Sequence, residues 1–226
     1  MSHSYTVMWA RDYCAALRKA GEAGRPLVVL FGGTHQSAPS LLRAGVSPGD
    51  TVFPVSVYQG SLYVLAGAVV REFVALADYA VTHLGLDRES VAGLQEYEIK
   101  EEVRQHCSNL GHRAPYGCGT EVALVERSTV LRFDIAVPSD RLSDVSFCPR
   151  KGGRLVLKYV RDGKLASALS LHGNVRRLCP DMASLFAELV GLGARHNKKK
   201  MKRMRASLSI LSKGSLRRLL MRCALR

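Results

Sequence analysis

The sequence predicts an α+β domain with flanking helices, followed by a basic helical C-terminal tail. Short apolar runs typical of strands alternate with segments whose apolar residues repeat about every 3.6 positions, as in helices. Hydrophobic residues make up 47% of the 226-residue chain, which is enough for a folded core. The 33 Lys and Arg exceed the 19 Asp and Glu, and the resulting net charge of +14 favours a polyanionic partner or an anionic surface.

A helix over 13–23 and a buried strand over 27–31 are the first elements that the sequence predicts. Apolar residues at helical spacing begin at Cys14, and a Gly-Arg-Pro break separates them from the run LVVLF. A short helix is then expected over 37–43, with Thr34 or Ser37 as its cap.

A hairpin and a longer helix come next. A Ser-Pro-Gly-Asp turn at 47–50 leads into two apolar strands over 51–58 and 61–70. Apolar residues then repeat with a helical period over 72–86, which predicts an amphipathic helix that ends at Gly85.

The second half of the domain is expected to contain a polar excursion, several strands and a final helix. The stretch from about 87 to 119 is rich in Glu, Gly and His and predicts an irregular segment or a loose helix. Apolar alternation predicts strands over 121–126, 129–137, 154–160 and 164–171, with an Asp-Gly hairpin turn at 162–163. Asp181 is the expected cap of the last helix.

The positive charge is concentrated at the C-terminus. Residues 195–226 hold 12 basic residues and no acidic one, whereas residues 1–194 hold 21 basic and 19 acidic residues, a net charge of +2. We therefore divide the chain into a domain, 1–194, and a basic tail, 195–226, expected to be a flexible arm or an amphipathic helix. The tail residues expected to bind phosphate are Lys198, Lys199, Lys200, Lys202, Arg203 and Arg205.

A strand, a Gly-rich turn, a short helix, a Pro-Gly-Asp turn and an apolar hairpin follow one another over 31–70. This order resembles the PUA-like superfamily, which includes the EVE, ASCH and YTH modules. The resemblance implies a small mixed β-barrel and the binding of RNA or DNA, often with a modified or flipped base. Trp9 is the sole Trp and lies outside the segment, so the aromatic cage of the modified-base readers is not expected.

Candidate nucleic-acid-binding residues also lie within the domain. Thr34 and His35 follow two glycines, which let a ligand approach the backbone, and both side chains could hydrogen-bond a base edge or a phosphate. Arg43, Arg176 and Arg177 are further candidates, as donors to phosphate. Alternatively, Thr34 only caps a helix, and the two neighbouring arginines form a solvated strand edge.

A group of His and Cys residues could carry other chemistry. His106, Cys107, His112 and Cys118 are of the types that bind zinc, but their spacing matches no known zinc motif, and we predict no metal and no cofactor. A Cys of this group could also pair with His112 as nucleophile and base, although no hydrolase signature surrounds them.

The six cysteines show no CxxC pair and no framework spacing, which favours free thiols in a reducing cytoplasm. No signal peptide is recognised at the N-terminus, and the longest apolar stretch, 62–70, is too short to span a membrane. We therefore expect a cytoplasmic protein.

The leading hypothesis is a non-enzymatic nucleic-acid-binding module whose basic tail binds the phosphate backbone. RNA and DNA, single-stranded or double-stranded, both remain open as partners. One alternative is an enzyme that acts on nucleic acid or nucleotides through the loop from Cys107 to Cys118. Another is an adaptor that binds an anionic membrane surface or a protein through helices of the tail.

Overall fold

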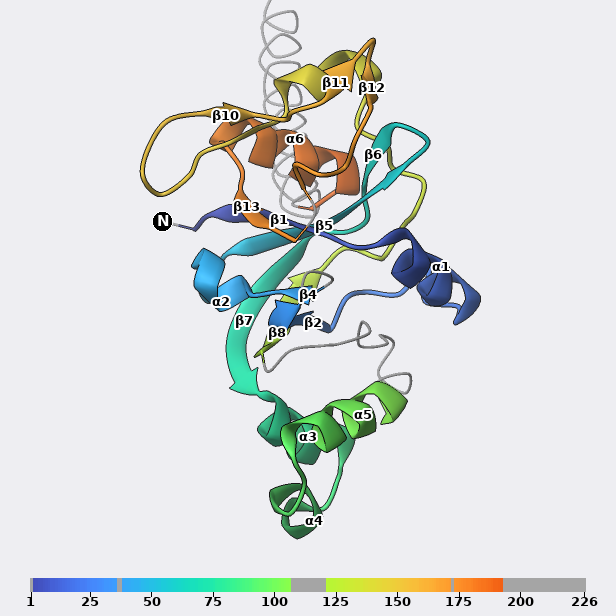
Figure 1. The fold of residues 1–226 in the computed structure, drawn as a ribbon, viewed down its shortest axis with the longest axis vertical. Helices are drawn as coiled ribbons and strands as arrows, with labels where there is room; N and C mark the ends of the chain where they lie inside the picture. Colours follow the sequence, from blue (N-terminus) through green and yellow to red (C-terminus); the bar gives the residue numbers. More distant parts are fainter. Residues whose placement is uncertain (1, 36–37, 107–120, 172, 193–226) are drawn as a thin grey trace, which may run out of the picture. The chain divides into compact units, whose positions relative to one another are not determined.

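A seven-stranded mixed sheet forms the centre of the fold in the computed structural model (Figure 1). The structure describes residues 2–35, 38–106, 121–171 and 173–192. In spatial order the strands are β13 (Val175–Arg177), β1 (Ser4–Met8), β5 (Thr51–Tyr58), β7 (Ala68–Ala75), β8 (Glu121–Ser128) and β2 (Val29–Gly32), while β6 (Ser61–Val64) also pairs with β5. β1 and β5 are parallel, and the other described pairs of this sheet are antiparallel. Together with the α-helices of the domain, this mixed sheet confirms the expected α+β fold.

The expectation of a small barrel is wrong, because the described residues form no closed barrel. The sheet ends at β13 and β2, which do not pair with each other. The segments expected to add long strands form two-residue ladders instead, β9 (Ser146–Phe147) with β10 (Leu155–Val156) and β11 (Val160–Arg161) with β12 (Lys164–Leu165).

The segment 129–137 makes isolated bridges in place of the expected strand. Its backbone N–H groups donate to different parts of the chain: that of Leu131 to the Arg25 carbonyl at 2.7 Å, and that of Arg132 to the Leu65 carbonyl at 2.8 Å. Because these partners belong to different segments, no continuous ladder forms, and the sheet stays open.

Six α-helices are described, and two of them lie in the stretch that was expected to be an irregular segment or a loose helix, which favours the helical alternative. They are α1 (Arg11–Lys19), α2 (Leu41–Ala44), α3 (Leu76–Leu84), α4 (Arg88–Ala92), α5 (Glu96–His106) and α6 (Pro180–Val190), with a 3-10 helix over Ser139–Asp144. α3 begins four residues later than predicted because residues 72–75 continue β7 and pair with β8. Among the described helices, none is long and apolar enough to cross a membrane.

The turn signals of the sequence are confirmed. Gly45 and Gly85 end α2 and α3 in the left-handed conformation, with φ of 85° and 74°. Asp50 closes the turn before β5, because its carboxylate accepts hydrogen bonds from the backbone N–H groups of His3 at 2.6 Å and Ser47 at 2.9 Å. The Asp-Gly pair at 162–163 joins β11 to β12.

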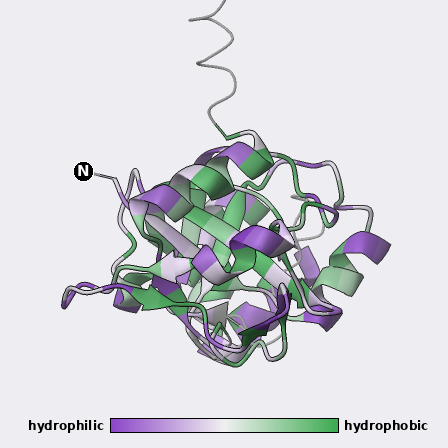
Figure 2. Ribbon diagram, turned by 90° about the horizontal axis from the view of Figure 1, so that it is seen from above, coloured by the Kyte–Doolittle hydropathy of each residue, from purple (hydrophilic) through white to green (hydrophobic). Residues whose placement is uncertain are grey.

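Many of the buried side chains belong to two hydrophobic clusters, and other buried residues, such as Phe53 and Phe186, lie outside them. Figure 2 shows hydrophobic residues gathered towards the middle of the fold. Trp9 and Leu17 belong to the cluster under α1, so the sole Trp is a core residue with 8% of its surface exposed. The second cluster joins β2 and β8 to α3, α4 and α5. There Phe31 and Tyr79 pack edge to face with ring centroids 5.8 Å apart, and Val103 contributes the buried side chain of α5.

A disulfide joins Cys148 to Cys179, with their Cα atoms 5.0 Å apart. The prediction of unpaired cysteines is therefore wrong for this pair. The sequence hides the pair because its members are 31 residues apart, and strand pairing brings them together. The backbone N–H of Cys148 donates to the Arg177 carbonyl at 2.9 Å, and Phe147 forms a β-bridge with Leu178. Cys14 is a free thiol, and it is buried.

Candidate nucleic-acid interface

Thr34 and His35 form a two-residue strand, β3 (Thr34–His35), which pairs with β4 (Ala38–Pro39). The expected helix cap, Thr34 or Ser37, is wrong for Thr34, and Ser37 lies outside the described residues. Ser40 is the cap of α2: its hydroxyl accepts a hydrogen bond from the Arg43 backbone N–H at 2.8 Å. Thr34 lies in the small ladder, so its alternative role as the cap is not realised. The side chains of Thr34 and His35 lie outside what the structure describes, and their contact with nucleic acid stays a prediction.

Glu121, the first residue of β8, completes the start of α2. Its carboxylate accepts hydrogen bonds from the Ser40 hydroxyl and from the backbone N–H groups of Leu41 at 2.9 Å and Leu42 at 3.2 Å. Gly32 allows this contact, since a Cβ there would lie 2.9 Å from the Glu121 carboxylate. The Glu121 carboxylate and the donors at the start of α2 are thus hydrogen-bonded to each other, so we assign these residues a role in stabilising the fold.

A cleft of about 470 Å³ opens between α1 and the strands β5 and β6. Its volume is in the range of small-molecule sites. The residues of α1 that line the cleft are spaced along one helical face. The described lining residues are Arg11, Cys14, Ala15, Arg18, Ser56, Tyr58, Tyr63, Leu65, Phe133 and Asp134.

Two arginines of α1 stack on aromatic rings at the walls of this cleft. The Arg11 guanidinium carbon lies 4.7 Å from the centroid of the Tyr58 ring, and that of Arg18 lies 4.7 Å from the centroid of the Phe133 ring. Arg18 also donates a hydrogen bond to the Phe133 carbonyl at 3.1 Å. These contacts place both guanidinium groups over aromatic rings at the walls of the cleft.

The cleft has an excess of positive charge. Its carboxylate, Asp134, is engaged by Arg132 through two hydrogen bonds of 3.0 and 2.7 Å. Hydrogen bonding by Arg132 lowers the pKa of Asp134, which therefore stays ionised and paired. The Cys14 thiol is no nucleophile in this state, because burial raises its pKa and the reactive form is the thiolate. The cleft is thus equipped for binding an anionic, aromatic ligand.

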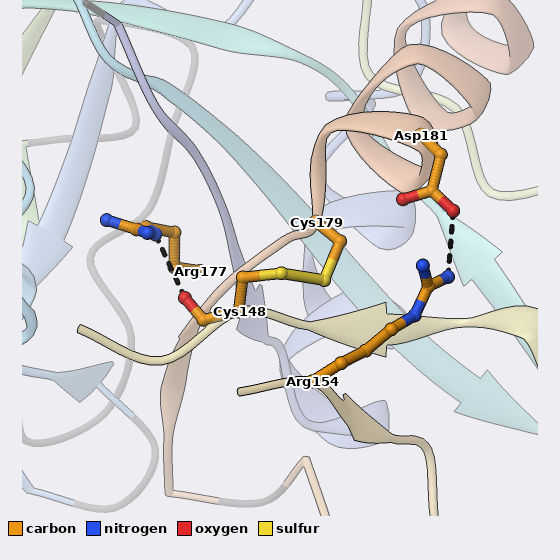
Figure 3. Close-up of a disulfide and its surroundings, with 5 residues drawn as sticks. All are labelled: Cys148, Arg154, Arg177, Cys179 and Asp181. Atoms are coloured by element: carbon orange, nitrogen blue, oxygen red, sulfur yellow. Dashed lines mark hydrogen bonds and ion pairs between the residues drawn. A yellow bond between two sulfur atoms is a disulfide. The ribbon is translucent and has the colours of Figure 1, made fainter. Parts of the chain in front are cut away.

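Arg176 and Arg177 lie on β13, a short strand that the sequence did not predict, and their environments differ. Arg177 donates from its Nε to the Cys148 carbonyl at 2.9 Å, beside the disulfide (Figure 3). Arg176 is half-buried, with its guanidinium carbon 5.4 Å from the centroid of the Phe147 ring. The interpretation of an ordinary solvated strand edge therefore holds for neither arginine.

The remaining predicted residues lie neither in the cleft nor on β13. Arg43 is exposed on α2. Asp181, the expected cap, is the second residue of α6 and pairs with Arg154 at 2.8 Å (Figure 3). His106 ends α5, whereas Cys107, His112 and Cys118 lie outside the described residues, as do the six basic residues proposed in the tail.

The cleft was not predicted as a site, although part of its signal is visible in the sequence. Arg11 and Arg18 are seven residues apart on one helix, which places both on the same face. Nothing in the sequence indicates that this face meets Tyr58 and Phe133, because those contacts depend on the tertiary fold.

By sequence, the chain matches no protein-family profile and no curated protein. By structure, it is similar to the ASCH protein of Zymomonas mobilis and to point mutants of that protein. The identity is 15% in each case, over 75% of this chain. For ASCH itself the match covers 96% of that chain with a TM-score of 0.28, and for one mutant it covers 99% with a TM-score of 0.29. The likeness to the ASCH group of PUA-like folds is weak and concerns the fold alone.

Proposed function

We propose that the protein is a nucleic-acid-binding module that holds an unstacked base in the cleft between α1 and the strands β5 and β6. The observation that carries this proposal is the pair of arginine–aromatic stacks, Arg11 with Tyr58 and Arg18 with Phe133, on the walls of a cleft of about 470 Å³. Guanidinium planes and aromatic rings are the groups on which single-stranded bases stack, and the positive charge attracts the adjoining phosphates.

The basic tail is the second part of the proposal. Its 12 basic residues, without an acidic one, would neutralise phosphates and release counterions. This attraction is independent of base identity, whereas the cleft supplies a preference for accessible bases. The tail therefore contributes affinity, and the cleft selects unpaired over paired strands.

The cleft is tested by fluorescence anisotropy with labelled single-stranded RNA, single-stranded DNA and duplex DNA of mixed sequence. Stacking on an aromatic side chain contributes about 1–3 kcal/mol per base, so Tyr58→Ala should weaken single-strand binding roughly 5- to 150-fold. Duplex binding should change little. Tyr58 is 41% exposed, so its removal should not unfold the domain.

The matched pair for charge is Arg11→Gln against Arg88→Gln. Both arginines are exposed helix residues, and each variant loses one positive charge, but only Arg11 lines the cleft. We expect Arg11→Gln to weaken single-strand binding and Arg88→Gln to change it less than about twofold. Equal effects of the two variants would show that the cleft takes no part in binding.

The tail is tested by truncation after Ala194 and salt titration of both proteins. If about six phosphates are neutralised, the full chain should show a slope of log affinity against log salt near ~−5 on duplex DNA, and truncation should flatten the slope towards zero. The unit Met1–Val190 contains the described sheet and core, so we expect the truncated protein to stay folded. An unchanged slope would assign the phosphate contacts to the domain.

A further inference from the structure

A second cavity, of about 490 Å³, lies beside the short ladders that precede β13. It combines cationic side chains with apolar and aromatic ones. Its described lining residues are Phe147, Arg154, Leu155, Val156, Lys158, Tyr159, Leu169, Ser170 and Arg176, and no carboxylate is among them.

The charge of the surrounding segment is strongly unbalanced. Residues 146–180 hold eight basic residues and one acidic residue, Asp162, whereas the rest of 1–194 holds 13 basic and 18 acidic residues. The net charge of the domain is therefore near zero because the positive charge of residues 146–180 is offset by the negative charge of its other residues. A small anion near this cavity is attracted by the whole segment as well as by the lining residues.

Arg176 is a half-buried cation of the cavity and has no ion pair among the described residues. Its Nε is buried and has no hydrogen-bond partner among the described residues, and the hydroxyl of Ser170 in the same cavity is buried and unpartnered as well. Burial alone lowers the pKa of Arg176. A desolvated cation without a carboxylate is costly, and a bound anion would offset that cost.

Two other cationic side chains line the cavity, and one of them is neutralised by an ion pair. Arg154 pairs with Asp181 at 2.8 Å (Figure 3). Lys158 is exposed and has no ion pair among the described residues. Arg176 and Lys158 together supply two positive charges, which match a dianionic phosphate monoester better than a carboxylate with its single charge.

The apolar part of the cavity is unusually exposed. Leu155, Val156 and Leu169 are 49%, 59% and 71% exposed, and Tyr159 is 51% exposed. Clustered exposed apolar side chains beside a cationic pocket are typical of a binding site rather than of ordinary surface. The Tyr159 ring offers a face on which a planar group can stack.

We propose that this cavity is a second binding site, for a nucleoside phosphate monoester, with Arg176 and Lys158 binding the phosphate and Tyr159 contacting the base. The phosphate can belong to a free mononucleotide or to the end of a nucleic-acid strand, since both present the same chemistry. This site is independent of the cleft beside α1, so either assignment can fail without the other.

The test uses the full-length protein with adenosine 5′-monophosphate, adenosine and inorganic phosphate in thermal-shift and calorimetric titrations. The monophosphate at about 100 times its dissociation constant should raise the Tm by roughly 5–10 °C, whereas adenosine should not. Arg176→Gln should weaken binding of the monophosphate at least tenfold, and Arg176→Lys, which keeps the charge but loses the planar fork, should weaken it less.

Two controls separate a binding role from a structural one. Lys151→Gln removes an exposed charge of the same segment outside the cavity and should leave binding of the monophosphate within about twofold. Without ligand, Arg176→Gln should melt at or above the wild-type temperature, because it removes a half-buried charge that has no ion pair among the described residues. Binding of the monophosphate that is unaffected by Arg176→Gln, or no binding at all, would overturn the proposal.

The source of the phosphate is identified by comparing a 5′-phosphorylated oligonucleotide with its unphosphorylated form. A preference for the phosphorylated strand that is lost in Arg176→Gln assigns the site to strand ends. Binding of the free monophosphate without such a preference assigns the site to a mononucleotide. Tyr58→Ala should weaken binding of both oligonucleotides but leave binding of the free monophosphate unchanged, which distinguishes this site from the cleft.

Discussion

Removal of the disulfide between Cys148 and Cys179 should lower the stability of the domain more than any single exposed substitution. The bridge closes a loop across a sequence separation of 31 residues. In the chain-entropy description, cross-linking a loop of this length restricts the unfolded chain by about 3.7 kcal/mol. The bridge also joins the segment that follows β9 to the residue that precedes α6, beside the Arg177 hydrogen bond to the Cys148 carbonyl.

The change is a double substitution, Cys148→Ala with Cys179→Ala, which avoids leaving one reactive thiol. For a domain of this size, 1 kcal/mol corresponds to about 2–4 °C, so the Tm should fall by roughly 7–15 °C. Urea denaturation should show a loss of about 2–4 kcal/mol in the free energy of unfolding.

The assay compares both proteins with and without a reductant. Reductant should destabilise the wild type by a similar amount and leave the double variant unchanged, which also controls for cysteines outside the described residues. A double variant that unfolds within about 0.5 kcal/mol of the oxidised wild type would refute the reasoning, because it would show that the loop is already ordered without the bridge.

Three further predictions concern single residues. Glu121→Ala removes the carboxylate that accepts hydrogen bonds at the start of α2, and urea denaturation should show a loss of about 1–3 kcal/mol; no loss would show that water replaces the carboxylate. Gly45→Ala places a side chain on a residue with φ of 85°, and its Cβ would also overlap the Arg150 guanidinium. The substitution should lower the free energy of unfolding by at least about 1–2 kcal/mol. An unchanged free energy of unfolding would contradict this backbone conformation. Burial raises the pKa of the Glu22 carboxyl, so the folded state binds its proton more tightly than the unfolded state, and this contribution to stability is lost as the pH rises through the raised pKa. Glu22→Gln should therefore be more stable than the wild type at pH ~7, and the difference in stability should close towards pH ~4. A difference that stays constant with pH would show that the carboxyl does not titrate in this way.

Local patterns in the sequence predicted those parts of the fold that depend on local chemistry. The hairpin of β5 and β6 was predicted from two apolar runs separated by residues 59–60, although the second run, 61–70, is divided between β6 and β7. The ends of α2 and α3 follow from the glycines that come after them. These features depend on a few adjacent residues, so no tertiary contact is needed to specify them.

The elements that the sequence left open or predicted wrongly depend on contacts that the sequence does not display. α5 has one buried residue, Val103, and its other faces carry charged pairs such as Lys100 with Glu96, so its apolar period is weak. The segment 129–137 alternates as a strand does, but its backbone bonds go to two different segments. The alternation of apolar and polar residues predicts which side chains are buried, but it does not predict which segment accepts the backbone hydrogen bonds.

The candidate sites divide in the same way. Arg176 was predicted as a phosphate donor from its position at the end of a strand, but its burial and the missing counter-charge required the structure. The cleft brings Arg11 on α1 together with Tyr58 on β5, and Phe133 from the segment 129–137 lines it as well. Such a meeting of distant segments has no local signature in a single sequence.

The most direct test of the proposed function is photo-crosslinking of the full-length protein to single-stranded RNA that contains 5-bromouridine, followed by mapping of the crosslinked peptides by mass spectrometry. Bases stacked on aromatic rings crosslink efficiently, so the proposal predicts adducts at Tyr58, Tyr63 or Phe133 in the cleft beside α1. Tyr58→Ala should abolish the adduct at that position and reduce the total yield. Crosslinks confined to residues 195–226, with none in the cleft, would contradict the proposal and reduce the protein to a non-selective phosphate binder.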